Sequence, residues 1–294
     1  MMKNFAKWFL KTIYRLFRGK QYGHNKNYWY LFDVRRDSDC RIIRLTYKSR
    51  RIKLAKSLPD KKKSDQLLLI ATGPSVQNIS KDWLRSTRAD IMGVNGAISL
   101  HGICFSYYCI IDPSFIRNRI NMVKAIVSNQ EITLFCNTPV LHEIMQNCKR
   151  HEIKCSFWLM DMIVNNICYP LGEKQSHPGS ESNPHHHWHN GFGFSSDMHK
   201  GIFDYGTVAY PAFQIACSLG YKKIMIAGLD MNNFDRPRFY ENVYDKLPTH
   251  LDRDFISIQG AFCTAASYCD SNNIDVLNLS PGSAIKAFNT GVPV

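Results

Sequence analysis

Residues 66–75 read Gln-Leu-Leu-Leu-Ile-Ala-Thr-Gly-Pro-Ser, a short apolar run that stops at a Gly-Pro turn. An uninterrupted apolar run of this length is typical of a strand buried on both faces of a sheet. Gly73 permits a tight turn, Pro74 fixes the backbone that follows, and Ser75 can cap the next helix, whose first amides would suit a phosphate. The stretch therefore predicts a buried strand and an anion-binding turn, although an ordinary turn has the same composition.

The same pattern recurs along the rest of the chain. Apolar runs that predict strands alternate with amphipathic segments that predict helices, and this alternation is typical of a mostly parallel sheet with helices on both faces. The predicted fold class is therefore α/β and Rossmann-like. The predicted strands are Leu67–Ala71, Ile91–Val94, Tyr107–Ile111, Ile132–Cys136, Lys223–Ala227 and Ile274–Leu279, and the predicted helices are Ser80–Thr87, Ile116–Val127, Pro139–Cys148, Tyr210–Leu219 and Phe255–Cys269.

Composition excludes several classes of protein. The chain has 294 residues, of which 45% are hydrophobic and 21% charged, so it can bury a core and is not expected to be disordered. Its longest apolar runs fall well short of the roughly 20 residues that cross a bilayer, and no signal peptide is recognisable. The ten cysteines show no CxxC pair and no regular zinc spacing. Free thiols in a reducing cytoplasm are the expectation.

Positive charge is concentrated at the beginning of the chain. Residues 1–63 contain 19 of the 37 Lys and Arg residues and four of the 24 Asp and Glu residues, a net charge of +15, whereas residues 64–294 carry −2. Pro59 and the lysine run 61–63 are typical of a linker. We therefore predict a basic amphipathic extension, 1–63, and a globular domain, 64–294.

Residues 1–20 predict a helix with one apolar and one cationic face. Such a helix is suited to the headgroup region of an anionic membrane, which predicts a cytoplasmic protein held peripherally on the inner-membrane surface. A terminal helix docked on the protein's own core, with a solvated charged face, is the alternative. Nucleic acid is not expected as a partner, because the chain has no zinc-finger spacing, no RNP-like motif and no basic recognition helix.

Polar residues marked by Gly or Pro follow five of the predicted strands. In open parallel sheets, ligands bind beyond the carboxyl ends of the strands, so these residues predict a nucleotide-type cleft. Ordinary turns remain the alternative, because an α/β domain without a ligand would also have turns there. The five strand ends are Ala71–Ser75, Val94–Gly96, Ile110–Ser114, Ile226–Asp230 and Asn278–Ser283.

Residues 66–290 resemble a bacterial family of lipopolysaccharide-core transferases that add a third Kdo, the WaaZ-like transferases. The segments that carry the resemblance are Gln214–Tyr221, Gly228–Asp230, Arg238–Tyr240, Leu251–Asp254 and Asn278–Pro281. A more distant resemblance to bacterial CMP-sialic-acid sialyltransferases runs through the Gly73 turn and the Asn95, Thr207 and Ser283 positions. Together they imply a sialyltransferase-like glycosyltransferase domain over 64–294 that uses a CMP-activated acidic sugar, with no cofactor and no metal.

The resemblance and the chemistry of a phosphate leaving group imply roles for individual residues. Tyr240 and Arg238 would stabilise the departing phosphate. A hydroxyl acceptor also needs a base, and His250, Asp230 or neither of them takes that role. Donor-binding residues would be Thr72, Gly73, Pro74, Ser75, Asn95, Thr207, Gly228, Ser280, Pro281 and Ser283. For Tyr240, Asn95 and the two serines, an aromatic lid or a plain turn is the alternative.

Residues 171–200 differ from the rest of the domain, because they are rich in Gly, Ser, Asn and Pro and contain the cluster His185–His189. Four neighbouring histidines can chelate zinc, but structural zinc sites usually add a distant pair of ligands. A lid that carries surface imidazoles is the favoured interpretation.

The leading hypothesis is a transferase that moves Kdo, or a related acidic sugar, from a CMP donor to lipopolysaccharide inner core or another lipid-linked glycan. The first alternative is a CMP-sialic-acid-dependent sialyltransferase. The second is a non-catalytic nucleotide-binding protein of envelope assembly.

Overall fold

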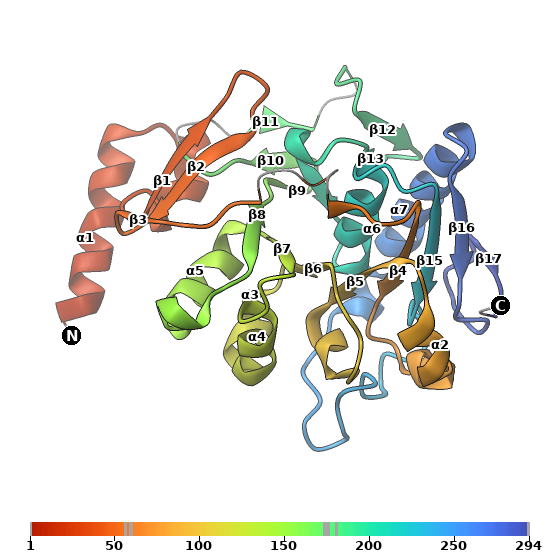
Figure 1. Cartoon of the computed structure of the whole chain (residues 1–294). Helices are drawn as coiled ribbons and strands as arrows, with labels where there is room; N and C mark the ends of the chain where they lie inside the picture. Colours follow the sequence, from red (N-terminus) through yellow and green to blue (C-terminus); the bar gives the residue numbers. More distant parts are fainter. Residues whose placement is uncertain (1, 56–57, 59–60, 173–176, 180–181, 293–294) are drawn as a thin grey trace.

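The computed structural model describes residues 2–55, 58, 61–172, 177–179 and 182–292, and at its centre lies an eight-stranded sheet (Figure 1). The strand order is β17-β16-β15-β4-β5-β6-β7-β8, and every neighbouring pair is parallel. The predicted parallel α/β fold is confirmed. The strands are β4 (Gln66–Ile70), β5 (Asp90–Val94), β6 (Tyr107–Ile110), β7 (Thr133–Cys136), β8 (Ser156–Leu159), β15 (Lys223–Ala227), β16 (Asp275–Asn278) and β17 (Asn289–Thr290).

The central strand β4 shows why an apolar run decides the fold. Its side chains alternate between two cores, since Leu67 and Leu69 pack on one face and Leu68 and Ile70 on the other. All four are fully buried. A strand covered on both faces cannot show the alternation of polar and apolar residues that marks a half-exposed strand.

Helices cover both faces of the sheet, as predicted. α3 (Pro113–Asn118), α4 (Ile120–Val127) and α5 (Thr138–Asn147) pack with one core, and α2 (Lys81–Ser86) lies on the same side. α6 (Ala209–Ser218) and α7 (Leu251–Ser271) pack with the other core. The predicted helix Ile116–Val127 is wrong in extent. Asp112 caps a helix that starts one turn earlier, and Arg119 breaks the segment with φ −131° and ψ 40°.

The basic extension begins with α1 (Met2–Phe17) and η1 (Lys20–Asn27) and continues as an antiparallel sheet. The strands of that sheet are β1 (Phe32–Arg36), β2 (Ile42–Tyr47) and β3 (Arg50–Arg51). A single bridge between Leu54 and Phe157 joins it to the edge of β8. Phe32 and Tyr47 are buried in the core that also contains α5. Of the predicted linker, residues 59 and 60 lie outside the described residues.

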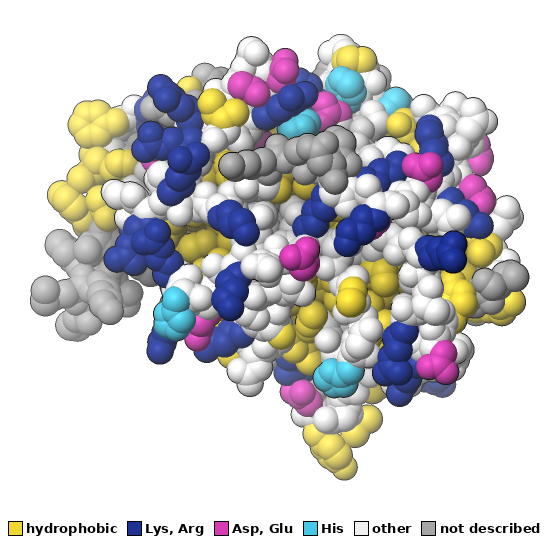
Figure 2. All heavy atoms as spheres, in the orientation of Figure 1, with side chains coloured by type: hydrophobic (Ala, Val, Ile, Leu, Met, Phe, Trp, Pro, Cys, Tyr) yellow, Lys and Arg dark blue, Asp and Glu magenta, His cyan; other side chains and the backbone are white. Residues whose placement is uncertain are grey.

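Exposed apolar side chains mark α1. Phe9, Leu16 and Phe17 are 51%, 76% and 82% exposed, whereas Tyr14 is buried and stacks on Trp29. Figure 2 shows hydrophobic side chains along the left edge of the molecule, with Lys and Arg gathered over the adjoining part of the extension. The helix therefore presents an uncovered apolar face beside a cationic surface. No helix among the described residues is long and apolar enough to cross a membrane.

The stretch around residues 171–200 contributes short strands that sequence patterns did not predict. β9 (Met162–Val164), β10 (Ile167–Tyr169), β11 (His177–Pro178) and β14 (Ile202–Asp204) form one small sheet. β12 (His186–His189) and β13 (Phe192–Ser195) form an antiparallel hairpin, and Phe192 of this hairpin packs against Gly260 of α7. Strands of two to four residues are too short to show a periodic pattern.

Candidate active site

A cavity of about 650 Å³ lies at the carboxyl ends of β4, β5 and β15. The chain order switches direction between β4 and β15, because β5 to β8 extend to one side of β4 and β15 to β17 to the other. Ligands of open α/β sheets bind at such a switch point. Nine residues predicted from sequence line this cavity, namely Thr72, Gly73, Asn95, Thr207, Gly228, Asp230, Arg238, Tyr240 and His250.

The floor of the cavity is the Gly73 turn, and Asp230 holds it in place. One carboxylate oxygen of Asp230 accepts the backbone N–H of Ser75 at 2.9 Å, and the other accepts the Ser75 hydroxyl. A Cβ at Gly73 would lie 2.5 Å from Oδ2 of Asp230 and 2.6 Å from the carbonyl oxygen of Gly228. Only glycine therefore fits between these two groups.

Ser280 and Ser283, predicted to meet the donor, instead use their hydroxyls within the protein. Ser280 Oγ accepts the N–H of Gly228 at 3.1 Å and lies 2.7 Å from Ser75 Oγ. Ser283 Oγ donates to the carbonyl of Leu229 and accepts the N–H of Ile285. Pro281 is exposed. None of these three residues lines the cavity, and neither do Pro74 and Ser75.

Asn95 carries an unpartnered polar atom at the cavity. Its Oδ1 is buried and accepts no hydrogen bond from the described residues. Its backbone has φ +43°, a left-handed conformation that is costly outside glycine, and the hydroxyl of Tyr108 secures it by donating to the Asn95 carbonyl at 2.7 Å. A strained residue with an orphaned amide oxygen in a cavity is a typical ligand-binding feature.

Tyr240 closes one side of the cavity. Its ring packs so closely on Gly96 that a Cβ there would lie 2.3 Å from the ring, and it meets Phe115 edge-on at 6.5 Å. Burial raises the pKa of the Tyr240 hydroxyl to about 12, against the opposing effect of Arg238. The phenol therefore stays protonated, as a hydrogen-bond donor, across the physiological pH range.

Arg238 is held by a carboxylate rather than free. Its guanidinium donates to Glu241 at 2.8 Å and to the carbonyl of Leu247 at 3.3 Å. The Glu241 side chain is fully buried and also lies 3.8 Å from Arg119, which pairs with Asp245 at 2.9 Å. These contacts fix residues 231–250, which contain no helix or strand, over the cavity.

One histidine and two aspartates line the far side of the cavity, where α7 begins. His250 precedes the first turn of α7 and is exposed at the rim, and Asp254 follows one turn later. Asp204, at the end of β14, faces the same cavity and accepts the N–H of Gly206 at 2.9 Å. Burial raises the pKa of Asp204, and the nearby charge of Asp254 raises it further.

Three charged residues of the cavity were not predicted from sequence. Asp204 lies in a three-residue strand, and Arg236 and Lys246 lie in the irregular segment 231–250. Arg236 is exposed, and Lys246 donates to the carbonyl of Phe234 at 2.7 Å. The run Asp235-Arg236-Pro237-Arg238 after a strand end was the available signal, because it places two guanidinium groups near a predicted phosphate site.

The histidine cluster 185–189 lies on the β12–β13 hairpin, away from the cavity lining. His186 Nε2 contacts the carbonyl of Lys200 at 3.1 Å, and His187 Nε2 contacts Ser196 Oγ at 3.1 Å. Asp252-Arg253-Asp254 has Asp-x-Asp spacing, and Asp254 there is paired with Arg253 at 2.8 Å. Within the described part of the chain, no group of three His, Cys, Asp or Glu residues is placed to hold a metal ion.

Comparison with known proteins finds one matching family model and two similar proteins. Residues 181–289 match the family model described as 3-deoxy-D-manno-octulosonic acid (Kdo) transferase WaaZ. A probable 3-deoxy-manno-octulosonic acid transferase of Escherichia coli (strain K12) is 26% identical over 253 residues, covering 78% of this chain and 82% of that protein. The protein of the same description from Salmonella typhimurium (strain LT2) is 33% identical over 93 residues, covering 32% and 34% of the two chains.

Among solved structures, the similar ones are sialyltransferases. CST-II, in complex with a trisaccharide acceptor and CMP, has a TM-score of 0.41 at 14% identity, covering 78% of this chain and 86% of that chain. The monofunctional α-2,3-sialyltransferase Cst-I from Campylobacter jejuni has a TM-score of 0.40 at 13% identity, covering 79% and 80%. The resemblance to Kdo transferases predicted from sequence is confirmed by the family model and both relatives. These matches support a glycosyltransferase.

Proposed function

We propose that this protein transfers Kdo, or a closely related acidic sugar, from a CMP-activated donor to an acceptor hydroxyl of a lipid-linked glycan. The observation that carries the proposal is the convergence of nine sequence-predicted residues on one cavity at the switch point of the sheet. Several of them fall within residues 181–289, which match the Kdo transferase family model. A sialyltransferase is the second candidate, because the solved structures with similar folds have that activity.

The donor would lie across the Gly73 turn with its phosphate facing segment 231–250. Asn95 Oδ1, which lacks a protein partner among the described residues, would accept a hydrogen bond from the nucleotide or the sugar. Tyr240 and Arg238 would stabilise the charge that develops on the departing phosphate, with Arg236 as a further cation. Pro74, Ser75, Ser280, Pro281 and Ser283 would act by shaping the turn.

In the transfer step, the acceptor oxygen forms a bond to the anomeric carbon of the sugar. The bond between that carbon and the phosphate oxygen breaks, and CMP leaves with the electron pair. A base takes the hydroxyl proton. We assign this role to His250, which stands at the rim where an acceptor enters, with Asp204 as the second candidate because burial raises its pKa. Asp230 would be a positioning residue, since both of its oxygens are bound to Ser75.

A membrane-bound acceptor is consistent with the extension. The exposed side chains of Leu16 and Phe17 would insert at the headgroup level, while neighbouring Lys and Arg attract anionic lipid. We therefore propose that residues 1–20 hold the enzyme peripherally on the inner membrane, at its cytoplasmic surface. The predicted lid, residues 171–200, stays a proposal, and its residues 173–176 and 180–181 lie outside the described residues.

The decisive experiment measures CMP release by the purified full-length chain, with CMP-Kdo or CMP-sialic acid as donor and deep-rough lipopolysaccharide as acceptor. Acceptor-dependent release from CMP-Kdo alone supports the proposal, and release from CMP-sialic acid alone favours a sialyltransferase. Asn95→Ala is the matched loss-of-function control. A folded protein that binds CMP but releases none from either donor would overturn the assignment and leave a nucleotide-binding assembly protein.

A further inference from the structure

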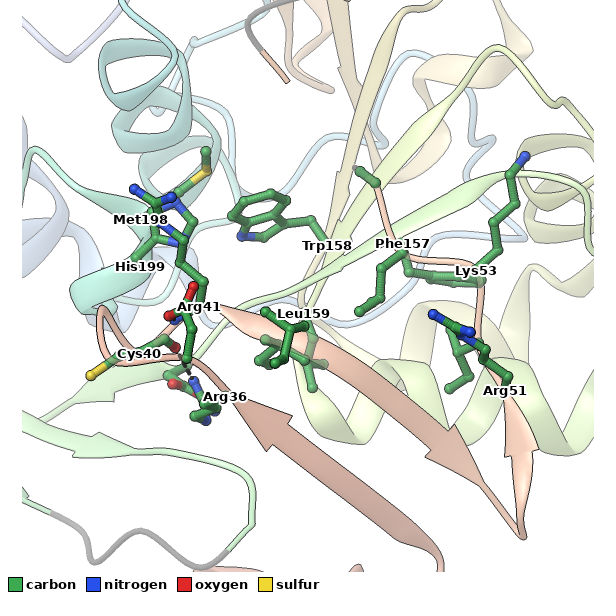
Figure 3. Close-up of a pocket in the computed structure, with 17 residues that line it drawn as sticks. Arg36, Cys40, Arg41, Arg51, Lys53, Phe157, Trp158, Leu159, Met198 and His199 are labelled. Atoms are coloured by element: carbon green, nitrogen blue, oxygen red, sulfur yellow. Dashed lines mark hydrogen bonds and ion pairs between the residues drawn. The ribbon is translucent and has the colours of Figure 1, made fainter. Parts of the chain in front are cut away.

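A second cavity, of about 720 Å³, lies between the small β1–β3 sheet and the edge strand β8 (Figure 3). It shares no lining residue with the candidate active site. The extension forms one wall and the globular domain the other. Ala55 N–H donates to the Phe157 carbonyl at 3.0 Å and Phe157 N–H to the Lys53 carbonyl at 2.8 Å, so the two walls are joined by backbone hydrogen bonds.

Cationic side chains stand at both ends of this cavity. Figure 3 shows Arg36 and Arg41 together at one end, beside His199, and Arg51 with Lys53 at the other. We call this space the two-ended cavity. Phe157, Trp158 and Leu159 lie between the two ends.

The positive charge of the two-ended cavity is not neutralised by the acidic residues that line it. Asp161 forms an ion pair with Arg36 at 2.8 Å. One oxygen of Asp37 accepts the backbone N–H groups of Asp39 and Arg41. Within the described residues, neither Arg41 nor Arg51 has a carboxylate at ion-pair distance. Two guanidinium groups, one at each end, are therefore available to an anionic ligand.

Arg36 adds an independent observation, because one of its buried donors is unsatisfied. Its side chain is only 10% exposed, and its terminal nitrogens donate to Asp161, to the Cys40 carbonyl at 3.0 Å and to the Leu171 carbonyl at 3.3 Å. Its Nε–H is buried and has no acceptor among the described residues. Buried donors almost always have a partner, so this N–H is an unsatisfied donor on a residue that lines the cavity.

The surface between the two ends suits a saccharide. Trp158 is half-buried, and its ring lies 4.9 Å from that of His199, which keeps the indole in place. The half-buried indole of Trp158, which lines the cavity, offers an apolar platform for the C–H face of a sugar ring. Guanidinium groups at the ends suit phosphate or carboxylate groups, which they bind in a bidentate manner.

We propose that the two-ended cavity binds a saccharide that carries phosphate or carboxylate groups at two separated positions. This inference rests on the proposed function in one respect, because it identifies that ligand as the anionic part of the acceptor glycan. The cavity lies in the interface that joins the basic extension to the catalytic domain. An acceptor held there would be anchored while its hydroxyl reaches the separate donor cavity.

Binding is tested with the full chain and no donor. The probe is a glucosamine disaccharide with one phosphate on each sugar, measured by titration calorimetry against its dephosphorylated form. We expect Arg41→Ala/Arg51→Ala to weaken binding of the bisphosphate at least tenfold. Arg44→Ala/Arg50→Ala is the matched control, since it removes the same charge from the same small sheet outside the cavity, and it should change affinity less than threefold.

Equal loss in both double variants would overturn the proposal, because it would indicate general charge attraction. Equal affinity for the dephosphorylated disaccharide, or equal competition by an oligonucleotide of the same charge, would also overturn it. Failure of the proposed function is a separate result. In that case the probe binds in a cavity-dependent way but no CMP-sugar is turned over. If CMP-Kdo is turned over and the double variant keeps the acceptor KM, the acceptor assignment fails.

Discussion

Two carboxylates in the candidate active site predict opposite effects of the same substitution. Asp204 and Asp230 both line the cavity, where Asp230 is buried and Asp204 is half-buried. The pKa of Asp204 is raised, first by burial and then by Asp254. Asp230 instead accepts two hydrogen bonds from Ser75. Asparagine keeps the size of the side chain and removes the charge, so Asp→Asn at each position measures whether the charge stabilises the fold.

For Asp204→Asn we expect equal or higher stability at neutral pH. A folded-state pKa above the unfolded value means that wild-type stability is greatest at low pH and declines as pH rises through the folded pKa. The variant lacks this decline, so its advantage grows as pH rises above about 4, near the ordinary carboxyl pKa of 3.8. The amide oxygen can still accept the Gly206 N–H, now 2.9 Å from the carboxylate.

For Asp230→Asn we expect destabilisation by about 1.5–3 kcal/mol, the usual contribution of a hydrogen bond to a charged group. The amide NH₂ would have to face a Ser75 donor that the carboxylate now accepts. For a chain of this size the melting temperature falls by roughly 3–10 °C.

Thermal unfolding of both variants and the wild type at pH 4 and pH 7.5, followed by circular dichroism, checks these signs. Wild type and Asp204→Asn should differ more at the higher pH. If Asp204→Asn loses as much stability as Asp230→Asn at pH 7.5, the uncompensated burial of Asp204 is refuted. If Asp230→Asn is as stable as wild type, Asp230 does not hold the Gly73 turn.

Four further outcomes follow from the site and the extension. Tyr240→Phe should lower CMP release about 10²–10³-fold without loss of stability; an unchanged rate removes Tyr240 from the leaving-group site. His250→Ala should lower turnover about 10²–10⁴-fold, and full activity would leave Asp204 as the candidate base. Leu16→Glu should reduce flotation with anionic vesicles and Ile256→Glu should not, although the two side chains are similarly exposed at 76% and 78%; equal flotation contradicts membrane attachment by α1. Dialysis against a chelator should leave CMP release unchanged, and loss that zinc restores would contradict metal independence.

The sheet could be predicted because its strands are buried on both faces. A short apolar run between turns, such as Leu67–Ile70, predicts a strand buried on both faces. The alternation of such runs with helical segments predicted the parallel sheet. β8 was not predicted, because Ser156–Leu159 alternates in burial at the sheet edge and is only four residues long. The helix break at Arg119 depends on contacts with Glu241 and Asp245, more than 120 residues away, which no local pattern contains.

The candidate site was predictable where it follows strand ends. Gly73, Asn95 and Gly228 are fixed by the strands before them, and all three line the cavity. Residues carried by irregular segments were harder. Arg236 reaches the cavity only because segment 231–250 folds back on the Gly73 turn, where Phe239 N–H donates to the Thr72 carbonyl at 3.3 Å. Ser280 and Ser283 show the converse, since a polar residue at a strand end can satisfy the backbone instead of a ligand.

The contact between the extension and the edge strand β8 explains where the two-ended cavity lies. An exposed edge presents unpaired backbone groups that invite pairing with other chains, so β8 needs a cover. Residues 53–55 supply it through two backbone hydrogen bonds to Phe157. The contact is short, because only Leu54 forms a bridge to β8. The space between the β1–β3 sheet and β8 is the two-ended cavity. Covering the edge thus places the arginines of the extension opposite Trp158 of the catalytic domain. If the extension were only a membrane anchor, α1 would suffice and nothing would require Arg41 and Arg51 at that wall. Vesicle flotation of Arg41→Ala/Arg51→Ala separates the two roles. If this variant floats like wild type but no longer binds the disaccharide bisphosphate, α1 anchors the protein and the two-ended cavity binds the glycan.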